Sequence, residues 1–279
     1  MSVRALLAAV SLLAVAAPAG AAPANPRLAG VRTFALDLGG TPTAAALRGY
    51  DLAVVDGDTP ASVVKALRAN GTIVLGYLDV GTIESYRSWY KAAKPYRLDY
   101  WPDWGEWYAA VAKPGFRRLI AGRVAPAALR RGFDGLFLDN VDMIETHRGQ
   151  RAGMLALVRQ LAKLPGMLFA QNGDDIIDPF LPYLDGWNRE DVTRTYDFDR
   201  KRYVAVGAGD HADAIASLKR IAARGKLVTA TDYVAAGDGS AAAAATQAAC
   251  AAGALSYVSD IDLKRVPAAT SLRCGRRRR

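Results

Sequence analysis

Short apolar runs recur along the chain, and segments of helical periodicity separate several of them. Each run has five or six residues, a length typical of buried strands in a parallel sheet. The eight runs are residues 33–38, 52–56, 73–78, 135–139, 167–171, 183–187, 226–231 and 253–258. Helical patterns cover residues 59–69, 153–163, 212–223 and 241–252, the last almost entirely alanine.

Alternation of strands and helices predicts an α/β fold with a parallel sheet. Eight strands fit a single (β/α)8 TIM barrel in number and in chain length. An open doubly wound sheet is the alternative, and it would carry a glycine-rich phosphate site after its first strand. A single segment of that type, residues 207–212, follows a later strand-like run at 203–206. We therefore favour the barrel.

The composition is that of a globular protein, with 51% apolar and 23% charged residues. These figures exclude a collagen, a coiled coil and a disordered chain. The net charge is +9, but Arg4 and the four arginines at 276–279 supply much of the excess. Because the body of the chain is only mildly basic, the charge gives little support to nucleic-acid binding.

The first residues resemble a secretory signal peptide. Arg4 precedes an apolar run at 5–17, and small residues follow at 19–21. The run is short for a transmembrane helix, although an uncleaved anchor is the alternative. We therefore expect a secreted or periplasmic protein without stable membrane insertion. The predicted organisation is a signal peptide at 1–22, a linker at 23–31, one barrel domain at 32–270 and a basic disordered tail at 271–279.

The chain has two cysteines and two histidines. In an exported protein Cys250 and Cys274 would form a disulfide, which on the loop-entropy model contributes roughly 3 kcal/mol. The alternative is a buried Cys250 and a free Cys274. His147 and His211 lie far apart and form no Cys/His metal motif. We predict no metal site and no cofactor.

Acidic residues follow most of the predicted strands. In a (β/α)8 barrel the carboxyl ends of the strands meet at one face, where catalytic groups lie. A ring of carboxyl groups suits hydrolysis of a glycosidic bond, because one protonates the leaving oxygen while another acts as nucleophile or activates water. Taken singly, each acid is better explained as a cap of the helix that follows its strand. The acids are Asp37, Asp56, Asp79, Glu84, Asp139, Glu190, Asp232 and Asp260.

Aromatic residues are concentrated after the third strand, between Tyr86 and Tyr108, where four of the five tryptophans lie. Pro95 and Pro102 exclude one continuous helix there. An insertion over the barrel mouth would offer flat faces on which sugar rings stack, and the alternative is a small core under a long loop. Single-stranded nucleic acid could also stack on these faces, but the neighbouring acids would repel its phosphates.

Four segments resemble glycoside hydrolase family 114, whose characterised activity is that of an endo-α-1,4-polygalactosaminidase. They are GYLDVGTIESYR at 76–87, GFDGLFLDNVD at 132–142, QNG at 171–173 and DGWNRE at 185–190. The resemblance extends over residues 32–262, and its most specific parts are the second and fourth segments.

The resemblance implies a barrel with a catalytic acid pair, Asp139 and Glu190, at the ends of strands four and six. By analogy with other barrel α-glycosidases, Glu190 would be the general acid and base and Asp139 the nucleophile, so the reaction would retain the anomeric configuration. The substrate-binding residues expected on the same basis are Asp37, Asp56, Asp79, Glu84, Tyr86, Asn140, Asn172, Trp187 and Tyr233.

One loop departs from the family pattern. We expect Ser-Val-Gly-Glu-Ala-Glu after the third strand, whereas residues 79–84 read Asp-Val-Gly-Thr-Ile-Glu. Thr82 thus replaces one acid and Asp79 adds another, which leaves the sugar open. We predict a secreted glycoside hydrolase that cleaves internal α-1,4 linkages of a galactosamine-containing exopolysaccharide, since acids attract a polymer with free ammonium groups. The alternative is a non-catalytic glycan-binding or biofilm-associated protein on the same barrel.

Overall fold

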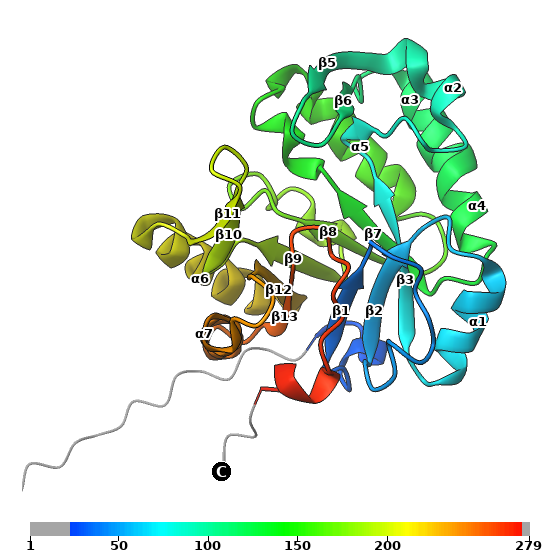
Figure 1. Cartoon of the computed structure of the whole chain (residues 1–279). Coiled ribbons are helices and arrows are strands. Elements are labelled where there is room, and N and C mark those ends of the chain that lie inside the picture. Colours follow the sequence, from blue (N-terminus) through cyan, green and yellow to red (C-terminus); the bar gives the residue numbers. More distant parts are fainter. Residues whose placement is uncertain (1–22, 275–279) are drawn as a thin grey trace, which may run out of the picture.

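The structure is a computed structural model that describes residues 23–274. Eight parallel strands form a nearly closed barrel, and their hydrogen-bonded order follows their order along the chain (Figure 1). This order confirms the predicted TIM barrel and excludes the doubly wound sheet, in which the strand order reverses. The barrel strands are β1 (Phe34–Asp37), β2 (Leu52–Asp56), β3 (Ile73–Asp79), β7 (Gly135–Asp139), β8 (Met167–Gln171), β9 (Gly186–Glu190), β12 (Leu227–Tyr233) and β13 (Leu255–Ser259).

The predicted strand positions are confirmed for β2, β7 and β8, and five others differ at their ends. The largest difference is in β9, which begins three residues after the start of the predicted run at 183–187. Residues 181–183 form a 3-10 turn that contains Pro182. Asp185 then uses its carboxylate to accept a hydrogen bond from the backbone N–H of Leu168 at 2.9 Å, so the ladder starts at Gly186.

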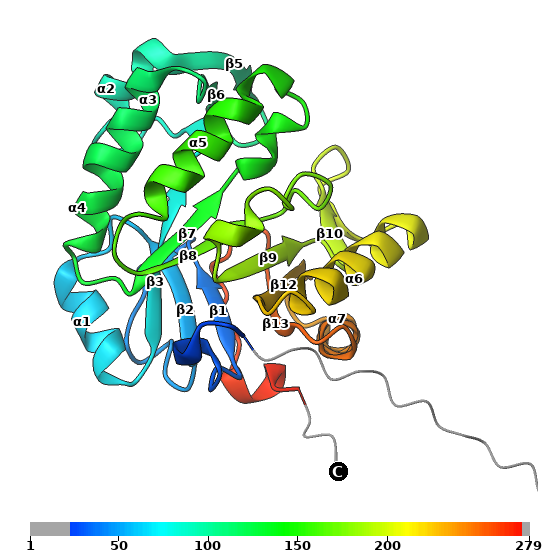
Figure 2. The same ribbon diagram turned by 180° about the vertical axis from the view of Figure 1, so that it is seen from behind.

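Helices surround the outside of the barrel, as the view from behind shows (Figure 2). The four predicted helical segments are confirmed as α1 (Ala61–Ala69), α5 (Arg151–Leu161), α6 (Ala208–Ala222) and α7 (Gly239–Ala251). A further helical stretch before β7 comprises α3 (Pro114–Leu119), a π-helical turn (Ile120–Val124) and α4 (Ala125–Leu129). Within residues 23–274, turns follow β1, and turns with one 3-10 helix (Leu181–Tyr183) follow β8, in place of α-helices.

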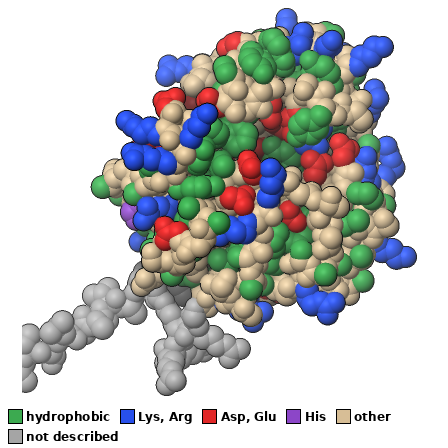
Figure 3. Space-filling view, in the orientation of Figure 1, with side chains coloured by type: hydrophobic (Ala, Val, Ile, Leu, Met, Phe, Trp, Pro, Cys, Tyr) green, Lys and Arg blue, Asp and Glu red, His purple; other side chains and the backbone are tan. Residues whose placement is uncertain are grey.

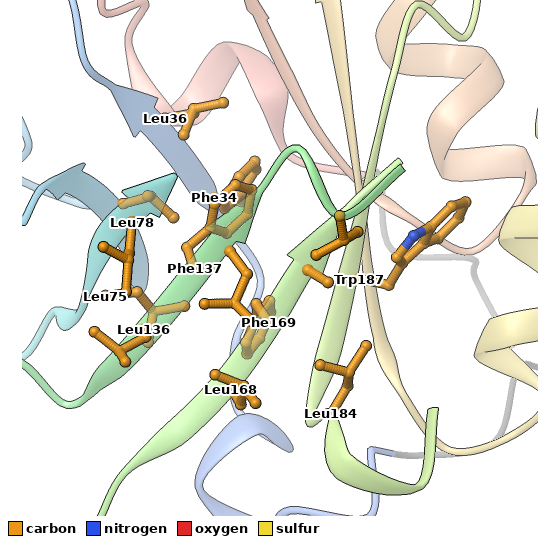
Figure 4. Packing of buried hydrophobic residues seen from close by; sticks show 14 of the residues in the cluster. Phe34, Leu36, Leu75, Leu78, Leu136, Phe137, Leu168, Phe169, Leu184 and Trp187 are labelled. Atoms are coloured by element: carbon orange, nitrogen blue, oxygen red, sulfur yellow. The ribbon is translucent and has the colours of Figure 1, made fainter. Parts of the chain in front are cut away.

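Large apolar side chains fill the barrel interior. Phe34, Phe137 and Phe169 are fully buried on β1, β7 and β8 and lie close together (Figure 4). Phe34 also packs edge-to-face against Tyr257 of β13, with ring centroids 6.0 Å apart. This contact brings the first and last barrel strands together. Among the described strands, the hydrogen-bonded order runs from β1 to β13, and side-chain packing closes the barrel between these two strands.

Acids at the amino ends of the strands hold the backbone. Asp51 accepts hydrogen bonds from the N–H groups of Arg32 and Thr33, at 2.8 and 3.0 Å. Asp134 accepts one from the N–H of Val74 at 3.0 Å. Because these carboxylates satisfy backbone donors at the face opposite to the strand ends, their role is structural.

The predicted linker packs against the barrel. Leu28 is fully buried, and Arg27 forms an ion pair with Asp134 at 2.6 Å. The first part of the predicted tail is also structured, because a 3-10 helix (Ala269–Leu272) precedes Cys274. Residues 1–22 and 275–279, on which the predicted signal peptide and the arginine run fall, lie outside the described residues.

Cys250 and Cys274 form a disulfide, with their Cα atoms 5.4 Å apart. The structure thus decides between the two alternatives that the sequence leaves open. Cys250 lies near the end of α7, and the Cys274 sulfur lies 3.6 Å from the carbonyl of Ala254, just before β13 begins. The bond therefore fastens the C-terminal segment to the amino end of a barrel strand.

Two antiparallel insertions extend from the barrel. The aromatic segment and the residues just before it form α2 (Tyr90–Ala93) and a three-stranded sheet of β4 (Thr82–Ile83), β5 (Arg97–Trp101) and β6 (Glu106–Ala109). A second insertion, between β9 and α6, is the hairpin of β10 (Arg194–Asp197) and β11 (Arg202–Ala205). Both follow the carboxyl ends of barrel strands, where insertions can shape a binding site.

Candidate active site

A cavity of about 570 Å³ opens at the carboxyl ends of the barrel strands. Asp139 at the end of β7 and Glu190 at the end of β9 both line it. Acidic side chains gather around the hollow on this face, with apolar surface between them (Figure 3). The acids that line the cavity are Asp56, Glu84, Glu106, Asp139, Asp142, Glu190 and Asp262.

Three hydrogen-bond donors surround the carboxylate of Asp139. The hydroxyl of Tyr77 donates to Oδ2 at 2.6 Å. The backbone N–H of Asn140 and the amide of Gln171 donate to Oδ1 at 2.8 and 2.9 Å. Burial raises the pKa of Asp139, and these three hydrogen bonds lower it because they favour the charged form. Asp139 is therefore held as a hydrogen-bond acceptor on both oxygens.

Glu190 has a different environment. Its Oε2 accepts a hydrogen bond from the amide of Asn172 at 2.8 Å, and its Oε1 accepts one from the hydroxyl of Tyr233. Burial, followed by the charges of Asp139 and Asp191, raises the pKa of Glu190 to about 8. At neutral pH Glu190 is therefore mostly protonated and has a proton to donate.

The residues that follow three barrel strands have an unusual backbone. Asn140, Asn172 and Asp191 each come directly after β7, β8 or β9 and have φ angles of 56°, 58° and 54°. This left-handed conformation is uncommon for residues other than glycine, and Asn and Asp adopt it most readily. Asn172 also accepts a hydrogen bond from the N–H of Glu190 at 3.0 Å, so its amide holds both the backbone and the side chain of that residue.

A buried arginine organises one wall of the cavity. Arg87 donates to both oxygens of Asp56 at 2.8 Å and forms an ion pair with Glu84. Its guanidinium also lies 4.9 Å from the ring centroid of Tyr86, whose hydroxyl donates to Glu84. Arg87 thus neutralises two of the acids on this wall, whereas Asp139 has hydrogen-bond donors beside it in place of a cation.

The aromatic residues of this segment divide between the core and the cavity wall. Trp89 is buried at 5% exposure and packs in the core, whereas Trp101 and Trp104 line the cavity. The indole of Trp104 is 46% exposed and packs against Phe198, with ring centroids 5.5 Å apart. Since Phe198 follows β10, this contact joins the two insertions beside the cavity.

The structure brings most of the predicted site residues to one cavity. Besides the acid pair, the predicted residues on its wall are Asp56, Glu84, Tyr86, Asn140, Asn172 and Tyr233. Three of the residues that we expected to line the cavity do not line it. Asp37, Asp79 and Trp187 are buried behind its wall.

Alternation along the strands explains two of these corrections. Leu38 lines the cavity, so the preceding Asp37 points to the other side of the strand. The side chain of Trp187 likewise faces away from the barrel interior, where Phe34, Phe137 and Phe169 lie (Figure 4). Its indole N–H donates to the carbonyl of Asn172 at 2.8 Å. Trp187 thus supports the residue that holds Glu190.

Asp79 is a structural acid in the loop after β3. Its carboxylate accepts hydrogen bonds from the N–H groups of Gly81 and Thr82, at 2.9 and 2.7 Å. It also accepts one from the amide of Asn140 at 2.7 Å. A side chain at Gly81 would collide with the Asn140 carbonyl, because a Cβ there would lie 1.9 Å from that oxygen. Asp79 therefore fixes the loop that lies against the end of β7.

Several lining residues were not predicted as site residues: Tyr77, Arg87, Glu106, Gln171 and Lys264. Strand alternation could have identified Gln171, the last residue of β8. No sequence signal could have identified Glu106, because its position depends on the register of β6 against β4. Burial, together with the charges of Glu84 and Asp139, raises the pKa of Glu106 to about 7, although a hydrogen bond from Thr82 at 2.5 Å opposes the shift.

Residues 23–274 contain no group of three or more His, Cys, Asp or Glu side chains arranged to hold a metal ion. In the same part of the chain, none of the helices has both the length and the apolar character needed to cross a bilayer.

The model of glycoside-hydrolase family GH114 matches residues 14–277. Among curated proteins, an uncharacterized protein of Deinococcus radiodurans is 29% identical over 126 residues, which are 43% of this chain and 40% of the relative. An uncharacterized protein of Thermotoga maritima is 22% identical over 218 residues, 67% of this chain and 65% of the relative. The matches thus span less than two thirds of the length of these curated relatives.

Two solved structures share the fold. The glycoside hydrolase domain of PelA from Pseudomonas aeruginosa superposes with a TM-score of 0.74 at 21% identity, covering 86% of this chain and 99% of that one. Aspergillus fumigatus Ega3, in a complex with galactosamine, gives a TM-score of 0.66 at 19% identity, covering 83% of this chain and 92% of that one. At these identities the superpositions establish the barrel architecture.

Proposed function

The chain belongs to glycoside-hydrolase family GH114, and we propose that it hydrolyses internal α-1,4 linkages of a galactosamine-containing exopolysaccharide with Asp139 and Glu190. The observation that carries this proposal is the unequal environment of two acids in one cavity. Asp139 accepts three hydrogen bonds, whereas burial and nearby negative charge raise the pKa of Glu190 to about 8. Two carboxyl groups in different protonation states are what acid-assisted glycoside hydrolysis requires.

In the first step, Asp139 attacks the anomeric carbon while Glu190 transfers its proton to the glycosidic oxygen. The carbon–oxygen bond to the leaving sugar breaks, and a covalent ester forms between Asp139 and the remaining chain. In the second step, Glu190 removes a proton from water, the resulting oxygen attacks the same carbon, and the ester bond to Asp139 breaks. Two displacements at one carbon retain the α configuration.

The charge of the cavity supports a cationic substrate. Both basic side chains on its wall are paired, Arg87 with Asp56 and Glu84 and Lys264 with Asp262 at 3.0 Å. An amino sugar with a free ammonium group brings a positive charge to the carboxylates that remain. The galactosamine complex of Ega3 supports a galactosamine polymer, and the exposed face of Trp104 offers a surface on which a sugar ring can stack.

The loop at residues 79–84 departs from the family pattern, and a carboxyl group from another segment lies beside the changed position. Thr82, which stands where the family pattern led us to expect an acid, donates its hydroxyl to Glu106 at 2.5 Å. Glu106 lines the cavity and so supplies a carboxyl group beside this position. We infer that Glu106 contributes to sugar binding in place of the missing acid.

Export from the cytoplasm is part of the proposal. The features of residues 1–22 suit a signal peptide. The Cys250–Cys274 disulfide supports an oxidising compartment, because such bonds are rare in cytosolic proteins.

The test is digestion of galactosamine-containing exopolysaccharides of defined acetylation, followed by mass spectrometry of the products and a count of new reducing ends. Internal cleavage predicts a ladder of oligosaccharides early in the reaction. A matched incubation with Asp139→Asn controls for contaminating hydrolases. Binding of the polymer without new reducing ends would overturn the catalytic proposal and support the glycan-binding alternative.

A further inference from the structure

A chain of buried polar side chains crosses the barrel interior at the level of Asp139. The hydroxyl of Thr229 donates to Oδ1 of Asn188 at 2.7 Å, and that of Thr231 donates to the same oxygen at 3.1 Å. Asn188 donates from Nδ2 to Oε1 of Gln171 at 2.8 Å. Gln171 in turn donates from Nε2 to Oδ1 of Asp139 at 2.9 Å. Four neighbouring strands, β12, β9, β8 and β7, each contribute to this chain.

These side chains are well removed from solvent. Asn188, Thr229 and Thr231 are fully buried, and Gln171 is 4% exposed. Barrel interiors are usually filled by branched apolar residues, and replacing a pair of buried hydrogen-bonding groups with apolar groups of the same shape is often nearly neutral for stability. Fold stability therefore does not require a polar chain here, which points to a role in the chemistry of Asp139.

Two side chains donate to Asp139, Tyr77 through its hydroxyl and Gln171 through its amide, and Gln171 is the one that a further buried side chain orients. The backbone N–H of Asn140 can only donate, whereas the Gln171 amide can present either its N–H2 group or its oxygen. With the oxygen toward Asp139 two acceptors would face each other, unless Asp139 carried a proton. Asn188 fixes the choice, because its N–H2 group faces the Gln171 oxygen and its own oxygen is engaged by the two threonine hydroxyls.

We propose that Asn188 is a positioning residue that orients the Gln171 amide and so keeps Asp139 ionised for attack on the sugar. The titratable groups around Asp139 are acids and phenols, and its charge raises the pKa of each of them: Tyr77, Asp79, Glu106, Asp142, Glu190 and Tyr233. Within residues 23–274, Asp139 forms no ion pair with a lysine, arginine or histidine. Its ionisation therefore depends on hydrogen-bond donors.

The test is a carbon-detected NMR titration of the Asp139 carboxyl, assigned by its absence in Asp139→Asn. Asn188→Leu has a similar shape but cannot donate to Gln171, and we expect it to raise the pKa of Asp139 by about one unit, the size of one hydrogen bond to a charged group. In a Gln171→Leu background the same substitution should add nothing, because the intermediary is gone. Additive shifts, or no shift in Asn188→Leu, would overturn the proposal.

Double variants at Thr229 and Thr231 test the same proposal without Asn188→Leu, so the test does not depend on whether that variant folds. Thr229→Val combined with Thr231→Val keeps the side-chain shapes and removes both hydroxyls, so it should also raise the pKa of Asp139. Thr229→Ser combined with Thr231→Ser keeps both hydroxyls and should give the wild-type pKa. Ser256→Ala removes a buried hydroxyl of β13 outside the chain of hydrogen bonds and should leave the pKa unchanged. An unchanged pKa in the valine pair would contradict the proposal.

The proposal rests on the proposed function only for its kinetic readout. In Asn188→Leu, the acidic limb of the pH profile of kcat should shift to higher pH. KM should not change, because Asn188 does not line the cavity. If the wild-type protein cleaves no amino-sugar polymer, the proposed function fails. The NMR titration still decides whether Asn188 controls Asp139.

Discussion

Glu190 lies on the barrel strand next but one to that of Asp139, and the two side chains line one cavity. Burial and the charge of Asp139 raise the pKa of Glu190 to about 8, while Tyr77, Asn140 and Gln171 supply hydrogen bonds that favour an ionised Asp139. The different surroundings of Asp139 and Glu190 in the barrel thus favour different protonation states of their carboxyl groups.

The first prediction concerns pH. Cleavage requires protonated Glu190 and ionised Asp139, so kcat/KM should follow a bell-shaped curve. Glu190 loses its proton as the pH rises through about 8, which sets the alkaline limb. The acidic limb should lie above the ordinary range for aspartate, because burial raises the pKa of Asp139. Initial rates measured between pH 4 and pH 10 test this, and activity that still rises above pH 9 would contradict it.

The second prediction separates the roles of the two acids. Glu190→Gln removes the proton donor, and with the polymer kcat should fall by roughly 10²- to 10⁴-fold. A synthetic α-galactosaminide with an activated aryl leaving group needs little protonation, so it should recover most of the first step in Glu190→Gln. The same substrate should not rescue Asp139→Asn, which lacks the nucleophile. Burst kinetics of aryl release measure both variants, and equal rescue of both would contradict this assignment.

The third prediction concerns the disulfide. Cys250→Ser with Cys274→Ser should lower the free energy of unfolding by roughly 3 kcal/mol, because the open segment gains entropy in the unfolded state. The bond lies toward the amino end of β13, on the face opposite to the cavity, so kcat and KM should not change. Urea denaturation with and without reductant measures the effect. Reductant should not alter the stability of the double variant, and loss of activity in it would show that the bond supports the site.

The fourth prediction concerns the aromatic contact between the insertions. Trp104→Ala removes an exposed ring that lines the cavity. A stacked ring contributes about 1 kcal/mol, so KM for the polymer should rise about fivefold. Phe198→Ala should have a smaller effect in the same direction, because Phe198 supports Trp104. Tyr100→Ala is a matched control, since Tyr100 is also exposed but does not line the cavity. Equal effects of all three substitutions would count against stacking.

The barrel could be predicted because each strand lies beside the next strand in sequence, so the strand count and short connections define the topology. Asp139 and Glu190 could be located because both end barrel strands. Asp37 and Trp187 were wrongly expected on the wall because a one-residue difference along a strand reverses the direction of a side chain. Glu106 and Phe198 depend on hairpin registers and on contacts between distant segments, which periodicity does not encode.

The most direct measurement of the central claim is the anomeric configuration of the first product, followed by proton NMR during cleavage of an α-linked galactosamine oligosaccharide. Attack by Asp139 with proton transfer from Glu190 gives the α anomer first, before mutarotation produces the β anomer. Initial release of the β anomer would show that water attacks the sugar directly and would contradict the nucleophilic role of Asp139.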